Sequence, residues 1–169
     1  MNVSELDAAP AAQARELLSA CCGAAPWVDA MLVARPFRDR ERLFAAADRA
    51  WDAITPGQLA EAIARHPRLG GTRAKAALSA REQAWSAGEQ SGVGSADDTA
   101  RTALAAGNEE YERRFGHTFI LCATGLGTND MLAALRRRLG NDAATERDIT
   151  GRELHKITRL RLEKLLAGA

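Results

Sequence analysis

The chain has 169 residues, of which 46% are hydrophobic and 27% charged, and its formal net charge is +1. This length predicts one ordinary domain with a well-buried core, and the near-neutral charge argues against a nucleic-acid partner. Because no apolar run is long enough to span a bilayer and the N-terminus lacks a signal segment, we expect no membrane partner either.

Alanine is abundant while β-branched and aromatic residues are sparse, which favours helix over strand. The three cysteines, Cys21, Cys22 and Cys122, are an odd number with an adjacent pair, a poor disulfide framework. We therefore expect a reducing cytoplasm and cysteines buried as small hydrophobic residues. No CxxC or HxxxH spacing occurs, so no metal site is predicted.

The predicted elements are all helices. Apolar residues at helical spacing, capping residues and Gly or Pro breaks predict about eight of them, over residues 10–21, 26–34, 39–54, 56–65, 79–91, 95–115, 128–139 and 143–166. We also expect Ser4 to cap a short turn before the first helix. The fifth begins near Thr72 or Ser79, and the last has a potential break near Gly151. Only residues 118–124 read as either an extended segment or a buried turn. We expect one compact all-α domain covering residues 1–169.

Four local signals complete this pass along the chain. Thr55-Pro56-Gly57-Gln58 and Ser79-Ala80-Arg81-Glu82 are capping boxes at helix starts. The run Arg136-Arg137-Arg138 ends a predicted helix, where solvated cations complement the helix dipole. Gly125-Leu126-Gly127-Thr128 precedes that helix and is a very weak anion-binding motif, because neither a Walker loop nor a Rossmann unit surrounds it.

His66 is a candidate for proton transfer because it stands directly before Pro67. A residue before proline is disfavoured in the α region, so the ring is expected where a helix stops. Its side chain titrates near neutral pH, as a general acid or base must. A purely structural ring at a helix end is the alternative.

Glu89 is the second candidate, with Ser86 and Gln90 on the same predicted helix face at spacings of three and four. Trp85 lies four residues before Glu89, which places the carboxylate beside a large apolar side chain. A carboxylate in that position needs a partner or a role. The alternative is an ordinary residue at the boundary of an amphipathic helix.

Arg161 is the third candidate because it interrupts an apolar stripe. In the last predicted helix this stripe consists of Leu154, Ile157, Leu162 and Leu165. An arginine on an inward face must meet an anion, either a protein carboxylate or a ligand, unless its side chain extends outward from the core edge. We predict that His66, Glu89 and Arg161 converge on one cleft.

Together these residues resemble a known family, the 2-oxo-4-hydroxy-4-carboxy-5-ureidoimidazoline (OHCU) decarboxylases of purine catabolism. The resemblance covers most of the chain and rests on a set of motifs in this order: Cys21-Cys22-Gly23, Trp27, Arg35-Pro36-Phe37, His66-Pro67-Arg68-Leu69-Gly70, Ser86, Glu89-Gln90-Ser91, Asn108, Tyr111, Phe115-Gly116, Phe119-Ile120, Cys122-Ala123, Lys156-Ile157 and Leu160-Arg161-Leu162.

The resemblance implies an all-helical, cytoplasmic homodimer that uses no cofactor. It implies decarboxylation of OHCU, formed from urate through 5-hydroxyisourate, to (S)-allantoin. The family's catalytic histidine and glutamate match His66 and Glu89, and its substrate-binding positions match Pro67, Ser86, Gln90, Phe119, Ile120 and Arg161. The last residues, Ala167-Gly168-Ala169, differ from the peroxisomal tripeptide of some eukaryotic members.

Two other functions fit the sequence. A hydrolase of a related ureide uses the same His and Glu chemistry. A non-catalytic helical binding module explains the helices and caps, but not the polar residues that interrupt two apolar stripes.

Overall fold

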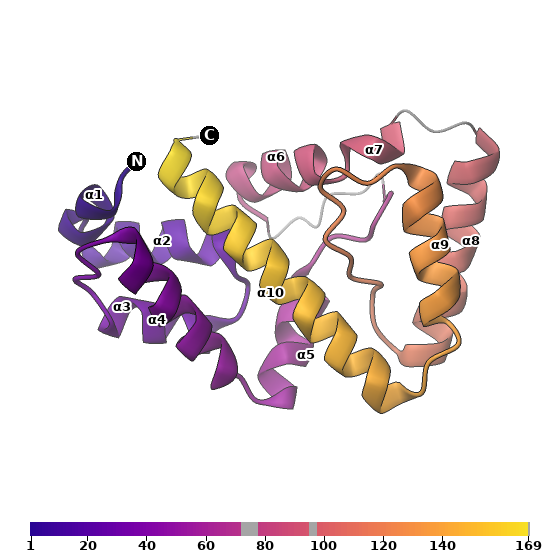
Figure 1. Ribbon diagram of the computed structural model, residues 1–169, viewed down its shortest axis with the longest axis horizontal. Helices are drawn as coiled ribbons and strands as arrows, with labels where there is room; N and C mark the ends of the chain where they lie inside the picture. Colours follow the sequence, from indigo (N-terminus) through magenta and orange to yellow (C-terminus); the bar gives the residue numbers. More distant parts are fainter. Residues whose placement is uncertain (72–77, 95–97, 169) are drawn as a thin grey trace. The chain divides into compact units, whose positions relative to one another are not determined.

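The computed structural model describes residues 1–71, 78–94 and 98–168, and all regular structure in these residues is helical (Figure 1). The all-α class is therefore confirmed. The described part of the chain forms ten helices: α1 (Val3–Ala8), α2 (Ala11–Cys21), α3 (Ala25–Val33), α4 (Arg40–Asp52), α5 (Pro56–Arg65), α6 (Ala80–Glu89), α7 (Ser91–Gly94), α8 (Asp98–Phe115), α9 (Thr128–Arg138) and α10 (Ala143–Ala167).

The described residues form more helices than predicted. The expected short first turn is the helix α1, which ends before Ala9, a residue that is extended (φ −63°, ψ 141°) because Pro10 follows it. Asn2 and Glu5, rather than Ser4, form the capping box of α1. The fifth predicted helix divides at Gln90, which leaves the helical region after α6 and is followed by the short α7.

Both capping boxes predicted from the sequence are present. Ser79 and Glu82 cap α6, whereas Thr72, the other predicted start, lies outside the described residues. Thr55 and Gln58 exchange hydrogen bonds at the start of α5. The last helix, α10, continues through Gly151 without a break. None of the described helices is long and apolar enough to cross a membrane.

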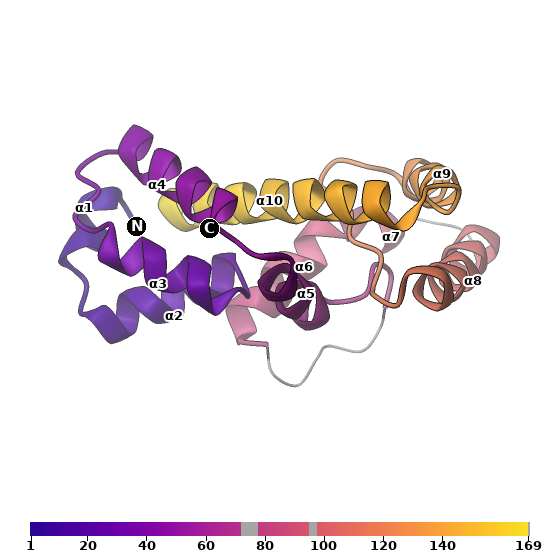
Figure 2. The same cartoon turned by 90° about the horizontal axis from the view of Figure 1, so that it is seen from below.

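The chain forms two compact units, Met1–Ala62 with His155–Ala169, and Ile63–Leu154. In the first unit α2 packs on α3 and α3 on α4 (Figure 2). Trp27 is fully buried there, and its ring nitrogen donates to the carbonyl of Ala47 at 3.1 Å. On the C-terminal part of α10, His155 stacks on Trp51. The expectation of one domain stays a prediction.

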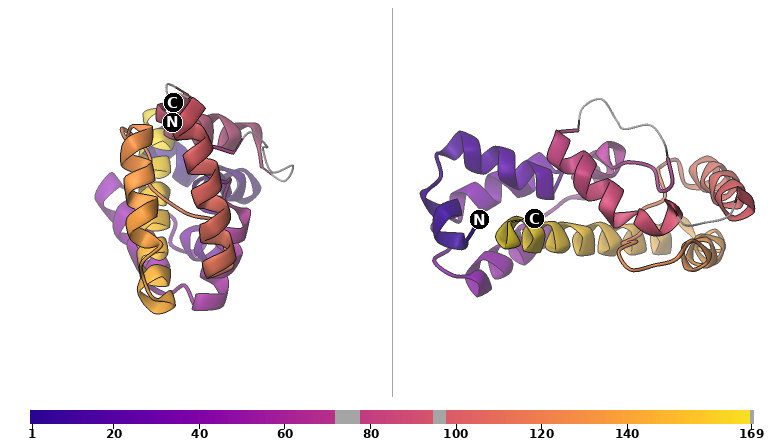
Figure 3. Two further views of the ribbon diagram at one scale, coloured as in Figure 1. Left: turned by 90° about the vertical axis from the view of Figure 1, so that its right-hand side faces the viewer. Right: turned by 90° about the horizontal axis from the view of Figure 1, so that it is seen from above.

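The second unit is built around the pair of α8 and α9, which lie side by side (Figure 3). Gly107 on α8 makes the close approach possible, because a Cβ there would lie 2.6 Å from a Leu135 methyl carbon on α9. The core of this unit collects side chains from both helices and from the segments that carry the candidate site: Leu69, Leu104, Tyr111, Phe119, Ala123, Met131, Leu132, Ala134 and Leu135.

Candidate active site

His66 lies directly after the end of α5, as predicted from the following proline. Its backbone N–H donates to the carbonyl of Ile63 at 3.0 Å, which closes the last turn of the helix. The ring is half-buried, and its Nδ1 lies 3.2 Å from the carbonyl oxygen of Pro67. A proton on Nδ1 would be donated to this carbonyl, which would make Nε2 the proton-accepting nitrogen of the neutral ring.

The loop that follows His66 is held from two sides. The amide of Gln90, at the end of α6, accepts from the N–H of Gly70 at 2.8 Å. The amide of Asn108, on α8, donates to the carbonyl of Leu69 at 2.9 Å. Gly70 has a φ of +69°, a conformation that favours glycine. The loop is thus fixed to α6 and α8 within the second unit.

The predicted polar face of α6 is buried. Trp85, Ser86 and Glu89 are 7%, 7% and 6% exposed, respectively. The prediction that Glu89 is withdrawn from water is therefore confirmed, whereas its contact with Trp85 stays a prediction. The capping box at Ser79 fixes where α6 begins and so which residues share this face.

Ser86 and Gln90 contact each other, as their spacing of four residues predicts. The amide nitrogen of Gln90 donates to the hydroxyl of Ser86 at 3.3 Å. Since the amide oxygen of Gln90 already accepts from Gly70, this side chain connects α6 to the loop of His66. Neither sequence spacing nor the family resemblance indicated this connecting role.

Phe119 and Ile120 lie in a segment that is neither helix nor strand, and both are 1% exposed. The segment over residues 118–123 is neither an extended strand nor a turn but irregular chain, and its residues are buried or half-buried. Without a ladder or a helix, its backbone polar groups need side-chain partners. One of these partners is Arg138, whose Nη1 donates to the carbonyl of Ile120 at 2.6 Å.

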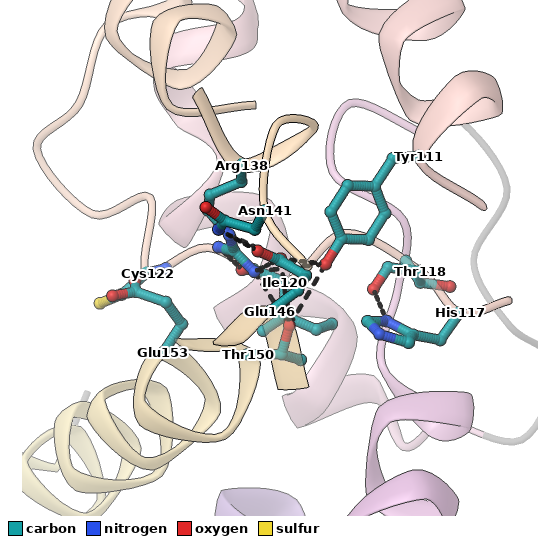
Figure 4. Close-up of polar contacts among 10 residues, drawn as sticks. All are labelled: Tyr111, His117, Thr118, Ile120, Cys122, Arg138, Asn141, Glu146, Thr150 and Glu153. Atoms are coloured by element: carbon teal, nitrogen blue, oxygen red, sulfur yellow. Dashed lines mark hydrogen bonds and ion pairs between the residues drawn. The ribbon is translucent and has the colours of Figure 1, made fainter. Parts of the chain in front are cut away.

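Arg138 belongs to a buried polar cluster that the sequence did not predict (Figure 4). Its Nε donates to Glu146 at 2.8 Å and its Nη2 donates to Thr150 at 2.9 Å. Tyr111 also donates to Glu146, as does Asn141 at 2.7 Å. Arg138 is 7% and Glu146 0% exposed, so the ion pair lies inside the protein.

The charges of this cluster shift two pKa values. Burial alone would raise the pKa of the Glu146 carboxyl, but hydrogen bonds from Arg138, Tyr111 and Asn141 hold it below its usual value. Burial, reinforced by the neighbouring Glu146, raises the pKa of Tyr111 well above its usual value. Glu146 therefore stays ionised and Tyr111 protonated at neutral pH.

The interpretation of the arginine run as a solvated last turn was wrong for Arg138. Arg136 and Arg137 are exposed, whereas Arg138 follows Leu135 by three residues and shares its buried face. That spacing was the available signal. The glycine loop before α9 also has a structural role: Thr128 donates to the carbonyl of Gly92 at 2.9 Å, and the carboxylate of Asp130 accepts from the N–H of Gly127 at 3.3 Å.

Arg161 is 6% exposed among the buried positions of α10, as its place in the apolar stripe predicts. It belongs to the first unit, whereas His66 and Glu89 belong to the second. The convergence of the three side chains on one cleft stays a prediction. Cys21 and Cys22 are buried as expected, and Cys122 is half-buried.

Comparisons with known proteins agree on one family. A sequence profile described as OHCU decarboxylase matches residues 7–163. A 2-oxo-4-hydroxy-4-carboxy-5-ureidoimidazoline decarboxylase from Amia calva is 36% identical over 139 residues, which cover 78% of this chain and 75% of that protein. A solved OHCU decarboxylase, crystallised in the presence of (S)-allantoin, superposes with a TM-score of 0.75 at 29% identity, covering 90% of this chain and 98% of that one.

The chain is also similar to part of a longer protein. The uric acid degradation bifunctional protein TTL of Arabidopsis thaliana is 29% identical over 147 residues. This match covers 87% of the present chain but only 45% of the Arabidopsis protein. The chain therefore corresponds to less than half the length of that relative.

Proposed function

Since the chain belongs to the OHCU decarboxylase family, we propose that it converts OHCU to (S)-allantoin in urate degradation. The observation that carries the proposal is the family match across residues 7–163, which includes every candidate site residue. The buried Glu89 and the half-buried His66 at the end of α5 support it, because both belong to the second unit and both groups suit proton chemistry.

The proposed reaction breaks one carbon–carbon bond and makes one carbon–hydrogen bond. The carboxylate leaves as CO2, and the electron pair of the broken bond moves into the ring, where adjoining polar atoms delocalise it. A proton then adds to one face of a ring carbon, and this face decides which enantiomer of allantoin forms. Fixed hydrogen-bond donors near the developing charge lower the barrier. The substrate itself accommodates the charge, so the proposed mechanism uses no cofactor.

We assign the proton to His66. With Nδ1 donating to the carbonyl of Pro67, the ring is held in one tautomer and one orientation, and Nε2 exchanges the proton. The carboxylate of Glu89 accepts a ureido or ring N–H of the substrate, or orients His66. The second N–H of Gln90 and the hydroxyl of Ser86 are available for amide edges of the substrate.

Arg161 is proposed to bind substrate because a buried guanidinium suits a carboxylate or a developing anion. Tight pairing to the ground-state carboxylate alone would not accelerate its loss, so we expect Arg161 to act on the charge that develops as CO2 leaves.

We further propose a cytoplasmic homodimer. The support is the family resemblance. Analytical ultracentrifugation at micromolar concentration tests the dimer, and a stable monomer would contradict it.

The function is tested by supplying freshly generated OHCU and following allantoin by circular dichroism. Spontaneous decay in achiral solution gives no net optical signal from the product, so the uncatalysed reaction is the built-in control. We expect the protein to produce the signal of (S)-allantoin. Formation of racemic allantoin at the uncatalysed rate, or hydrolysis of a ureide instead, would refute the proposal.

A further inference from the structure

Leu121 lies between two peptide groups that are both anchored by buried or half-buried side chains. On one side, Arg138 Nη1 donates to the carbonyl of Ile120 at 2.6 Å. On the other, the N–H of Cys122 donates to the carboxylate of Glu153, on α10, at 2.9 Å. Both anchors come from the second unit (Figure 4). The chain at Leu121 is irregular, yet neither adjoining peptide plane is free to turn.

These anchors determine the direction of the polar groups of Leu121. In a trans peptide the C=O and N–H point in opposite directions, and the only cis peptide in the described residues is Arg35-Pro36. The N–H of Leu121 therefore points away from Arg138, and its C=O points away from Glu153. Neither group has a hydrogen-bond partner among residues 1–71, 78–94 and 98–168.

Arg138 is itself rigidly held, which makes it a suitable anchor. Its guanidinium is fixed by Glu146 and Thr150, and its Cζ lies 4.5 Å from the centroid of the Phe119 ring. The planar fork of arginine satisfies all these partners at once, whereas lysine offers a single charged nitrogen. One buried side chain thus fixes both the ring of Phe119 and the peptide after Ile120.

We propose that Arg138 and Glu153 are positioning residues that aim the backbone N–H and C=O of Leu121 at the ureide edge of the substrate. The inference rests on the proposed function, because the family resemblance puts substrate-binding positions at Phe119 and Ile120. A ureide offers an N–H donor and a C=O acceptor close together, so one residue with an oriented donor and acceptor complements it. Preorganised backbone groups lose no orientational freedom when the substrate binds.

Arg138→Lys tests the first anchor, with Thr150→Val as its matched control. The lysine keeps a positive charge beside Glu146 but cannot also reach the Ile120 carbonyl and Thr150. Thr150→Val removes one hydrogen bond from the same guanidinium and leaves the Ile120 bond intact. Because each variant removes a buried hydrogen bond, we expect both to lower the melting temperature. We expect only Arg138→Lys to raise KM, by about two- to tenfold, the range for a lost hydrogen bond between neutral groups.

Glu153 tests the second anchor without disturbing the buried ion pair. Glu153→Ala removes the acceptor of the Cys122 N–H while keeping a good helix former in α10. Glu153→Gln retains an oxygen that accepts this hydrogen bond. We expect Glu153→Ala to raise KM by a similar factor and Glu153→Gln to restore it. This pair decides the matter if Arg138→Lys does not fold.

Three results would overturn the inference, and they differ from one another. Folded Arg138→Lys and Glu153→Ala variants with wild-type KM and kcat would refute it while the proposed function stands. If Thr150→Val raised KM as much as Arg138→Lys, the role of Arg138 would be structural only, and the inference would also be refuted. A wild-type chain that does not decarboxylate OHCU would refute the proposed function, and the inference with it.

Discussion

Replacing Arg138 by methionine should destabilise the protein strongly, because the change leaves the fully buried carboxylate of Glu146 without its cation. Breaking a buried ion pair costs about 3–5 kcal/mol of unfolding free energy. Glu146 keeps two donors, Tyr111 and Asn141, which reduces the loss. The carbonyl of Ile120 loses its partner, which adds about 1–3 kcal/mol. We therefore expect a total loss of about 4 kcal/mol.

The pH dependence of this loss identifies its cause. In the wild type the pKa of Glu146 is held down, so its contribution to stability is present above the usual carboxyl pKa and is lost as pH falls through the lowered value. Without Arg138, burial disfavours the charged form of the Glu146 carboxylate. Protonation of this carboxylate in acid removes the buried charge and so reduces the loss of stability in the variant. The difference in unfolding free energy between the two proteins should be largest at neutral pH and smaller in acid.

Urea unfolding at neutral and acidic pH measures both effects. Arg101→Met is the control, because its ion pair with Asp98 lies in the same unit but joins side chains that are 48% and 92% exposed. Exposed pairs contribute about 0–1 kcal/mol. A loss in Arg138→Met no larger than in Arg101→Met, or a loss independent of pH, would refute the assignment of a buried, ionised Glu146.

Three further predictions follow from single contacts. Gly92→Ala should destabilise the protein by about 1–3 kcal/mol in urea unfolding, because its Cβ would lie 2.1 Å from a loop carbonyl oxygen. The control Gly88→Ala has open space around its Cβ and should be neutral or stabilising. Equal effects of the two substitutions would contradict the predicted clash at Gly92. Burial opposes a low pKa at Asp48, yet the hydrogen bond and charge of Arg159 hold this pKa below its usual value. In an NMR titration, Arg159→Gln should raise the pKa of Asp48, and an unchanged titration midpoint of Asp48 would exclude Arg159 as the cause. Arg161→Lys should lower kcat, by about tenfold or more, because a two-pronged donor becomes a point charge; a rise in KM alone would make Arg161 a uniform-binding anchor.

The sequence predicted those features that depend on neighbours along the chain. Pro67 alone was sufficient to place His66 at the end of a helix, and Ser79 and Glu82 placed the start of α6. From that start, helical spacing put Ser86 and Glu89 on one buried face. These are local rules of backbone sterics and hydrogen bonding, which apply whatever the rest of the chain does.

The features that were missed depend on partners distant in the sequence. Arg138 was assigned to a solvated turn because its charge suits a helix end, yet its partners Glu146, Tyr111 and Ile120 come from three other segments. The double use of Gln90 likewise depends on the loop at Gly70 lying against α6. Sequence spacing describes one helix at a time, so it does not reveal which polar groups meet when helices pack.

The role of His66 is the central claim, and comparison of His66→Asn with the wild type on fresh OHCU tests it most directly. Truncation at a helix end should cost little packing, so far-ultraviolet circular dichroism should show an intact fold. We expect the enzymatic rate to fall about 10²-fold or more, the range for a lost general acid–base group, with the remaining allantoin largely racemic. A folded variant that still forms (S)-allantoin at the wild-type rate would remove His66 from the mechanism.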